Sequence, residues 1–133
     1  MKKRKPLSKD ILRRISENSD LEKKAYAFGK YIHANQGLCG FKYMIYAIQL
    51  VMEVPEADFT GENGVYARVA EKFHVQNTSC IERGIRHLCE NLIKDMELSK
   101  YEAIFGTTQK LTNRRLIFSA CNFIRYESEK LPV

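Results

Sequence analysis

Apolar residues recur along most of the chain at the three- and four-residue spacing of amphipathic helices, and no stretch alternates for long enough to predict a strand. The segment from Asp20, the expected N-cap, to Ile32 shows this spacing clearly. Its apolar stripe consists of Leu21, Ala25, Phe28 and Ile32. Residues 41–54 are apolar on most of their circumference, which is typical of a helix at the centre of a fold. Residues 7–15 have weaker helical character.

Glycine and proline divide the rest of the chain into short segments. Two glycines interrupt residues 33–40, Pro55 ends the central helix, and Gly61 and Gly64 mark a loop. Further helices are predicted over residues 65–73, 78–93, 99–105 and 112–130. We therefore expect an all-α fold of about six helices with short connections. Residues 20–133 are expected to form a single domain, preceded by a basic arm, residues 1–19, that is partly disordered or helical.

The net charge of +6 lies entirely in the first part of the chain. Residues 1–14 hold one acidic side chain, Asp10, and seven basic ones, whereas the remaining residues are neutral overall. The basic side chains are Lys2, Lys3, Arg4, Lys5, Lys9, Arg13 and Arg14. A basic arm on a neutral body suits a polyanionic partner such as nucleic acid, and a solvated terminus of the same composition is the alternative.

The composition bounds the class of protein. With 133 residues, of which 44% are apolar and 29% charged, the chain is long enough for one domain with its own core. No apolar run approaches the roughly 18 to 20 residues that span a bilayer, and no signal-peptide segment follows the basic N-terminus. We therefore expect a cytoplasmic protein without a membrane partner.

Four cysteines are scattered without a C-x-x-C pair, and such thiols are usually free and buried. They are Cys39, Cys80, Cys89 and Cys121. A zinc set of His74, Cys80, His87 and Cys89 has spacings that match no standard zinc pattern, so we expect no metal and no other cofactor. His87 beside Cys80 or Cys89 lacks a third group to orient a catalytic pair, and "FTGENG" lacks the lysine of a phosphate-binding loop. We therefore expect no enzyme activity.

Residues 65–92 have the layout of a helix-turn-helix, in which a short helix, the turn "HVQNT" and a longer helix follow one another. Asn77 or Thr78 is the expected cap of the second helix. Its inward sector consists of Ile81, Ile85, Leu88 and Leu92, which we expect to pack on the helices predicted over residues 65–73 and 41–54. The opposite side carries Ser79, Arg83, Arg86 and Glu90, flanked by Glu82 and His87.

The polar side of this second helix has the chemistry that base readout in the DNA major groove requires. An arginine donates two hydrogen bonds to a guanine, and a glutamate such as Glu82 accepts from a cytosine amino group. Asn77, Thr78 and Ser79, at the start of the helix, can bind phosphates. An ordinary surface helix, stabilised by pairs such as Glu82–Arg86, is the alternative.

The stretch "VYARVAEKFHVQNTSCIERGIRHLCE" resembles the DNA-binding effector domains of sporulation-initiation response regulators, the stage zero sporulation protein A family, which have the form "LYPxIAxxFNTTxSRVERAIRHAIE". The matching residues are Tyr66, Ala70, Lys72, Phe73, Thr78, Ser79, Glu82, Arg83, Ile85, Arg86, His87 and Glu90. Upstream, "GFKYMIYAIQLV" is similar to the family's "GYxYLREAI", and downstream "IFG" and "LTNRRLIFSACNFI" are similar to "FG" and "PTNSEFIAMVADKL". The resemblance covers roughly residues 21–127.

The resemblance implies a six-helix domain of the response-regulator effector type, within the winged-helix-like superfamily, that binds double-stranded DNA as a transcription regulator. It implies base readout by Glu82, Arg83 and Arg86. The backbone-positioning candidates are Asn77, Thr78, Ser79, Cys80 and His87. RNA polymerase and a second copy of the chain on DNA are further candidate partners. The alternative is a protein-interaction module that keeps the fold, has lost DNA reading and modulates a full-length regulator or RNA polymerase.

Three departures from the family pattern bear on this expectation. Cys80 stands where the family has an arginine, so one groove-facing cation is lost. Gly84 replaces an alanine, which either weakens the helix by about 0.5–1 kcal/mol or permits close approach of another backbone. The residues before the match are too few for a phosphoacceptor receiver domain, so we expect a regulator that phosphorylation does not switch unless a receiver domain acts in trans.

Overall fold

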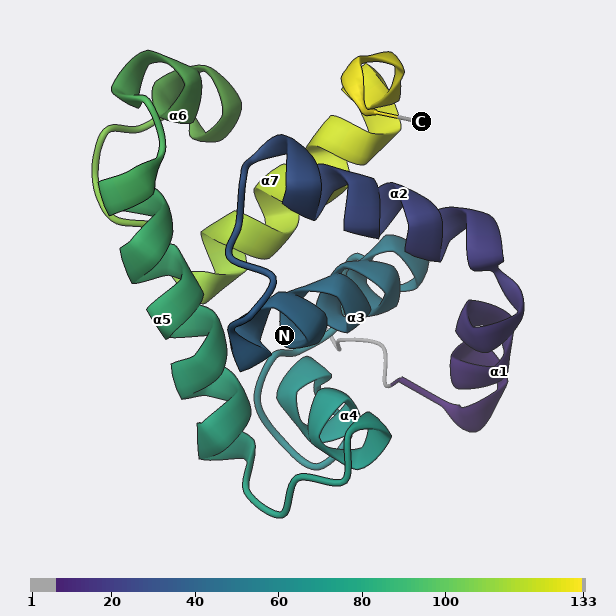
Figure 1. Cartoon of the computed structure of the whole chain (residues 1–133). Helices are drawn as coiled ribbons and strands as arrows, with labels where there is room; N and C mark the ends of the chain where they lie inside the picture. The colour runs from purple at the N-terminus through teal and green to yellow at the C-terminus, as the bar shows by residue number, and fades with distance from the viewer. Residues whose placement is uncertain (1–6, 133) are drawn as a thin grey trace.

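Helix α3 (Cys39–Glu53) lies at the centre of the fold, and five other helices pack around it (Figure 1). The structure, a computed structural model, describes residues 7–132. The surrounding helices are α1 (Lys9–Glu17), α2 (Ser19–Tyr31), α4 (Val65–Lys72), α5 (Thr78–Asp95) and α7 (Asn113–Glu127). Helix α6 (Leu98–Phe105) packs against α7, and a 3-10 turn (Ser128–Lys130) follows α7. No strand forms within residues 7–132, so the all-α prediction is confirmed.

The central position of α3 follows from its sequence. Apolar residues occur on nearly every side of the helix, and Met44, Ile48 and Leu50 are completely buried among its neighbours. A helix that is hydrophobic all round is stable only when other elements cover it on all sides. The helix ends at Glu53, shortly before Pro55, as the sequence predicted.

Helix α1 is the described part of the basic arm, and it packs against α3. Leu7, just before the helix, and Ile15, within it, are buried in the core. Ser8 caps the helix by accepting a hydrogen bond from the Ile11 amide. The basic side chains of residues 2–5 lie outside the described residues, and a domain boundary at residue 19 stays a prediction.

The helix ends follow local capping chemistry, with one correction. The N-cap of α2 is Asn18 and not Asp20, because the Asn18 side chain accepts a hydrogen bond from the Leu21 amide at 3.1 Å. Asp20 lies in the first turn instead. Gly106 ends α6 in the left-handed conformation, as expected of a glycine at that position.

The cysteines differ from the expectation of four buried thiols. Cys89 and Cys121 are buried, and burial raises the pKa of each to about 12. Cys39 is exposed because it is the first residue of α3, and Cys80 is half-buried in the first turn of α5. All four are free, and among residues 7–132 no three histidine, cysteine or acidic side chains are placed to hold a metal ion. No described helix is long and apolar enough to cross a membrane.

Candidate nucleic-acid interface

Helices α4 and α5 and the turn between them have the geometry of a helix-turn-helix. His74, in the turn, has a φ of 56°, in the left-handed region that side chains other than glycine rarely adopt. The Val75 amide donates to the Ala70 carbonyl across 2.8 Å, which folds the turn back onto α4. Asn77 caps α5 by accepting from the Ser79 amide at 2.8 Å. The predicted order of short helix, turn and longer helix is therefore confirmed.

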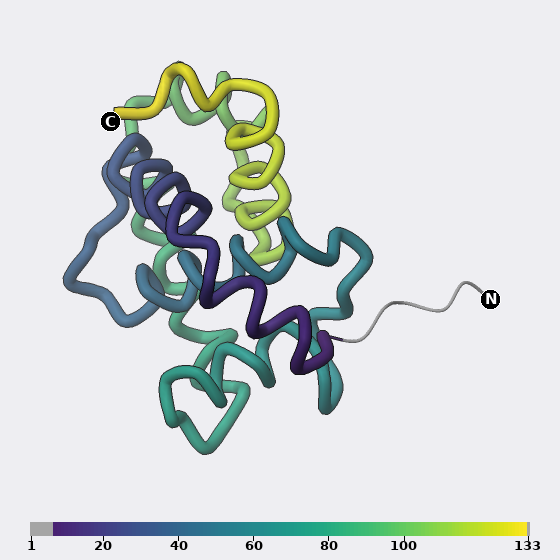
Figure 2. The backbone as a smooth tube through the Cα atoms, turned by 90° about the vertical axis from the view of Figure 1, so that its right-hand side faces the viewer, coloured from purple at the N-terminus to yellow at the C-terminus, as the bar shows by residue number. Residues whose placement is uncertain are grey.

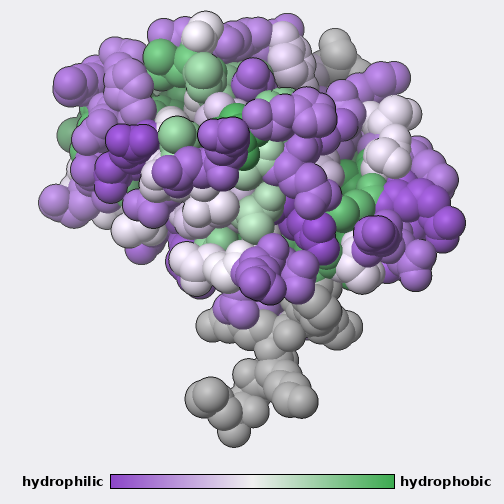
Figure 3. Space-filling model, turned by 90° about the horizontal axis from the view of Figure 1, so that it is seen from below, coloured by the Kyte–Doolittle hydropathy of each residue, from purple (hydrophilic) through white to green (hydrophobic). Residues whose placement is uncertain are grey.

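The helix-turn-helix occupies one end of the molecule. Figure 2 shows the turn between α4 and α5 projecting at the end opposite to that of α7 and the C-terminus. Seen from this end, the surface is mainly hydrophilic, with only scattered apolar side chains (Figure 3). A projecting helix-turn-helix of this kind has the shape that entry into a groove of DNA requires.

The inward side of α5 packs on α3 and α4, as the sequence predicted. Ile81, Ile85, Leu88 and Leu92 are all buried. Gly84 lies on the side that crosses α3, where a Cβ atom added to Gly40 would come within 2.1 Å of the Gly84 carbonyl oxygen. A Cβ atom added to Gly84 itself would lie 3.0 Å from the Tyr43 ring. Gly40 thus permits the close approach of the two backbones. A Cβ atom on Gly84 would lie at an ordinary 3.7 Å from the Gly40 Cα atom, so the Tyr43 ring is the neighbour that crowds it.

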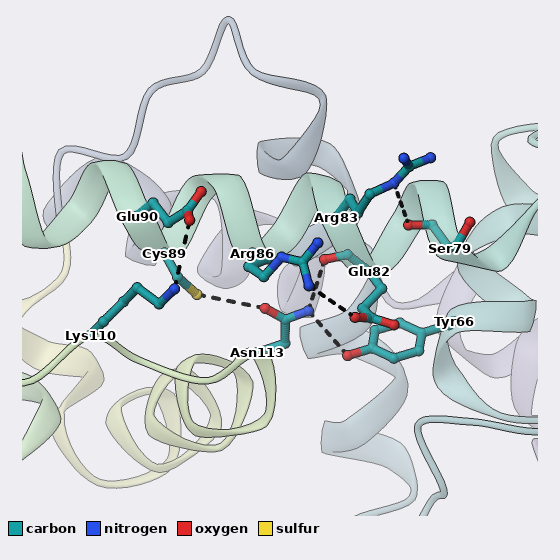
Figure 4. Close-up of polar contacts among 9 residues, drawn as sticks. All are labelled: Tyr66, Ser79, Glu82, Arg83, Arg86, Cys89, Glu90, Lys110 and Asn113. Carbon is teal, nitrogen blue, oxygen red and sulfur yellow. Dashed lines mark hydrogen bonds and ion pairs between the residues drawn. The ribbon is translucent and has the colours of Figure 1, made fainter.

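The outward side of α5 presents Arg83 and Arg86 on successive turns (Figure 4). The Arg83 guanidinium folds back toward the start of the helix, where Nε donates to the Ser79 carbonyl at 3.3 Å. Arg86 lies 3.5 Å from a carboxylate oxygen of Glu82, and about half of each side chain is exposed (49% and 47%). An exposed pair at this spacing is worth only about 0.3–0.5 kcal/mol, so it holds the arginine loosely.

The start of α5 carries the three polar residues expected to bind phosphates. All three are exposed. The Asn77 carboxamide oxygen accepts from both the amide and the hydroxyl of Ser79, the latter at 2.6 Å. In the free protein, the side chains of Asn77 and Ser79 therefore stabilise the N-terminus of α5. The exposed Thr78, between them, adds a hydroxyl to the same end of the helix.

Cys80 and His87 lie on the same side of α5 as Gly84, between its outward and inward sides. Cys80 is half-buried, and its sulfur lies 3.6 Å from an Arg83 guanidinium nitrogen. His87 is exposed, and its carbonyl accepts from the Asn91 side chain at 3.1 Å. Both residues thus lie beside the outward row of Arg83, Arg86 and Glu90, which we call the arginine stripe, and neither belongs to it.

Asn113, at the start of α7, fixes the position of α5 and was not singled out from the sequence as a site residue. Its side-chain nitrogen donates to the Glu82 carbonyl at 2.9 Å and to the Tyr66 hydroxyl at 3.2 Å (Figure 4). Its oxygen lies 3.9 Å from the Cys89 sulfur. Asn113 is 9% exposed, and burial raises the pKa of Tyr66, so the hydroxyl stays protonated in this contact. One amide therefore connects α4, α5 and α7 behind the arginine stripe.

Lys110 and Arg114 also lie beside α5, although the sequence offered no periodic signal for them. Lys110 lies 3.6 Å from a carboxylate oxygen of Glu90, on the arginine stripe. Arg114 stacks on the buried Phe59 ring, with 4.8 Å between the guanidinium carbon and the ring centroid. Both side chains are exposed. The tertiary fold alone brings these two cations, far from α5 in sequence, next to Arg86.

Comparison with known proteins agrees with this geometry. The family model described as "Sporulation initiation factor Spo0A C terminal" matches residues 29–128, most of the chain. The matched range includes α3 to α7 and every candidate site residue. No curated protein matches the chain.

Proposed function

We propose that this chain, which belongs to the family of the sporulation initiation factor Spo0A C-terminal domain, regulates transcription by binding specific DNA sequences through α5. The family is one of helical DNA-binding domains, and the fold agrees with it. The observation that carries the proposal is the pair of exposed arginines, Arg83 and Arg86, on the outward side of the second helix of a helix-turn-helix. The second helix of this motif is the one that enters the major groove.

Arg83 and Arg86 are proposed to read guanines, with Glu82 beside them accepting from a cytosine. A bidentate contact between arginine and guanine gives about 1–3 kcal/mol of discrimination. This exceeds the about 0.3–0.5 kcal/mol that an exposed Glu82–Arg86 pair contributes, so the free protein can release Arg86 to a base. The release of Arg86 also frees the Glu82 carboxylate for its own contact.

The residues around this pair are proposed to bind the DNA backbone. Asn77, Thr78 and Ser79 lie at the positive end of the α5 dipole, where phosphates are favoured. Cys80 and His87 flank the stripe and are proposed as positioning contacts. Since a cysteine side chain cannot be a cation, Cys80 does not replace the positive charge that the family's arginine supplies.

The proposed setting is a regulator that acts on promoter DNA in the cytoplasm. A second copy of the chain on the same DNA and RNA polymerase are the further partners proposed. Both would bind surfaces other than the outward side of α5, because the DNA covers that side.

Selection of binding sites from a random duplex library by the purified chain tests the proposal. We expect an enriched motif that contains guanines, bound more tightly than random duplex in a fluorescence anisotropy titration. Binding should weaken as salt rises, since phosphate contacts release counterions. A library without enrichment, or binding that does not respond to salt, would contradict DNA reading and favour a protein-interaction module of the same fold.

A further inference from the structure

A hollow of about 450 Å³ lies beside α5, between the loop that precedes α4 and the start of α7. Three cationic side chains line it, namely Arg86 from α5 and Lys110 and Arg114 from the α7 side. The Glu82 carboxylate also lines the hollow, and the Glu90 carboxylate holds Lys110 at 3.6 Å. The site therefore contains cations that neighbouring acids only partly neutralise.

Arg114 stacks on a buried ring beside this hollow, whereas the next residue, Arg115, binds the end of α6. The Arg114 guanidinium lies 4.8 Å from the centroid of the buried Phe59 ring, which orients it by a cation–π contact. This contact uses the face of the guanidinium, so its N–H groups can bind a ligand. Arg115, in contrast, donates two hydrogen bonds to the Phe105 carbonyl, at 3.1 and 3.4 Å, and so ties α7 to the end of α6. Of the adjacent pair, Arg114 alone lines the hollow.

We infer that Lys110 and Arg114 form a phosphate-binding site that holds the DNA backbone beside the arginine stripe of α5. The inference rests on the proposed function, because it takes α5 to lie in the major groove. A groove is bordered by phosphate backbones, so cations on the same side as Arg86 meet a backbone when Arg86 reaches a base edge. The ligand is a phosphodiester, and recognition does not depend on the base sequence.

The ion pair between Lys110 and Glu90 limits how strongly this site binds a phosphate. Both side chains are about half exposed (50% and 45%), so solvent screens their attraction. A pair of this kind is weak enough for a phosphate to displace the carboxylate. Glu90 therefore competes with DNA for Lys110, and removal of its charge should strengthen DNA binding.

Titrations of single variants with a short random-sequence duplex test the inference without knowledge of the target site. The variants are Lys110→Ala and Arg114→Ala, measured by fluorescence anisotropy at several salt concentrations. Each should weaken binding several-fold, and should lower the slope of log affinity against log salt by about 1. Lys23→Ala, which removes an exposed cation from α2, is the matched control and should leave the slope unchanged.

Glu90→Gln should strengthen DNA binding, whereas the two alanine variants should weaken it. It frees Lys110 and should tighten binding to the random duplex, a result that loss of stability cannot produce. The double variant Glu90→Gln with Lys110→Ala should bind no better than Lys110→Ala alone, because the lysine that Glu90 restrains is then absent.

The outcomes separate this inference from the proposed function. If the wild-type chain binds duplex DNA but both alanine variants keep the wild-type slope, the phosphate site is wrong and the proposed function stands. If Glu90→Gln tightens binding equally with and without Lys110, the competition between Glu90 and DNA is wrong. A wild-type chain that binds no duplex at any salt concentration would overturn both.

Discussion

The two sides of α5 are specified in different ways. On the inner side, the backbones of α3 and α5 cross so closely that a methyl group on Gly40 has no room beside the Gly84 carbonyl. On the outer side, Arg83 and Arg86 are exposed and make only weak contacts within the protein. The inner side therefore constrains shape and determines stability, whereas the outer side is free to change at little cost to folding.

The two departures from the family pattern, at residues 80 and 84, lie at different places on α5. Gly84 lies toward the inner side, where its carbonyl packs against Gly40 of α3 and the Tyr43 ring leaves little room for a side chain. Cys80 lies at the border, half-buried and in contact with Arg83. Gly84 is thus a packing residue. Of the two departures, only Cys80 lies where it can change DNA recognition.

The largest effect is expected from Gly40→Ala. Its Cβ atom would lie 2.1 Å from the Gly84 carbonyl oxygen, and backbone cannot move aside as a flexible side chain can. We expect a loss of about 3 kcal/mol or more in the free energy of unfolding, measured by urea denaturation. Gly37→Ala is the control, because its added Cβ would meet only the Asn35 side chain, at 3.2 Å. A Gly40→Ala protein as stable as the control would contradict the statement that the inner side of α5 determines stability.

Asn113→Ala is expected to have the next largest effect. It leaves the Glu82 carbonyl and the Tyr66 hydroxyl without the hydrogen bonds that the Asn113 amide donates to them. Loss of such buried contacts costs about 1–3 kcal/mol of unfolding free energy. Asn122→Ala, at an exposed position of the same helix, should change stability little. Equal stabilities of the two variants would show that α5 is held without Asn113.

A smaller effect is expected from Gly84→Ala. The added Cβ would lie 3.0 Å from the Tyr43 ring, which can shift, and alanine favours a helix by about 1 kcal/mol over glycine. We expect a net loss of about 1 kcal/mol or less in thermal or urea unfolding. The same change in a Tyr43→Leu background should be neutral or stabilising. Destabilisation that persists without the Tyr43 ring would mean that Gly84 serves another purpose.

The helices and the inward stripe of α5 could be predicted because both follow from local periodicity. Ile81, Ile85, Leu88 and Leu92 recur at helical spacing, and each is buried as expected. Asn77 was one of two expected caps and is the one observed, since its side chain can accept from an amide two residues later.

The remaining features depend on which helices meet in space. Asn113 appeared in the sequence only as part of a "TN" helix start, yet it contacts residues 31 and 47 positions earlier. Lys110 and Arg114 show no spacing that links them to α5, and the close contact of Gly40 with Gly84 joins two helices far apart in sequence. Such contacts are set by tertiary packing, which periodicity within one segment does not describe.

The paired variants Arg83→Ala and Arg86→Ala test most directly whether the outer side of α5 reads DNA bases. Site selection with each variant, alongside urea unfolding, separates recognition from stability. We predict unfolding free energies within about 0.5 kcal/mol of wild type, because both side chains are exposed. We also predict that each variant loses preference for guanine at particular positions of the selected site. Variants that select the wild-type site with undiminished preference would contradict the account.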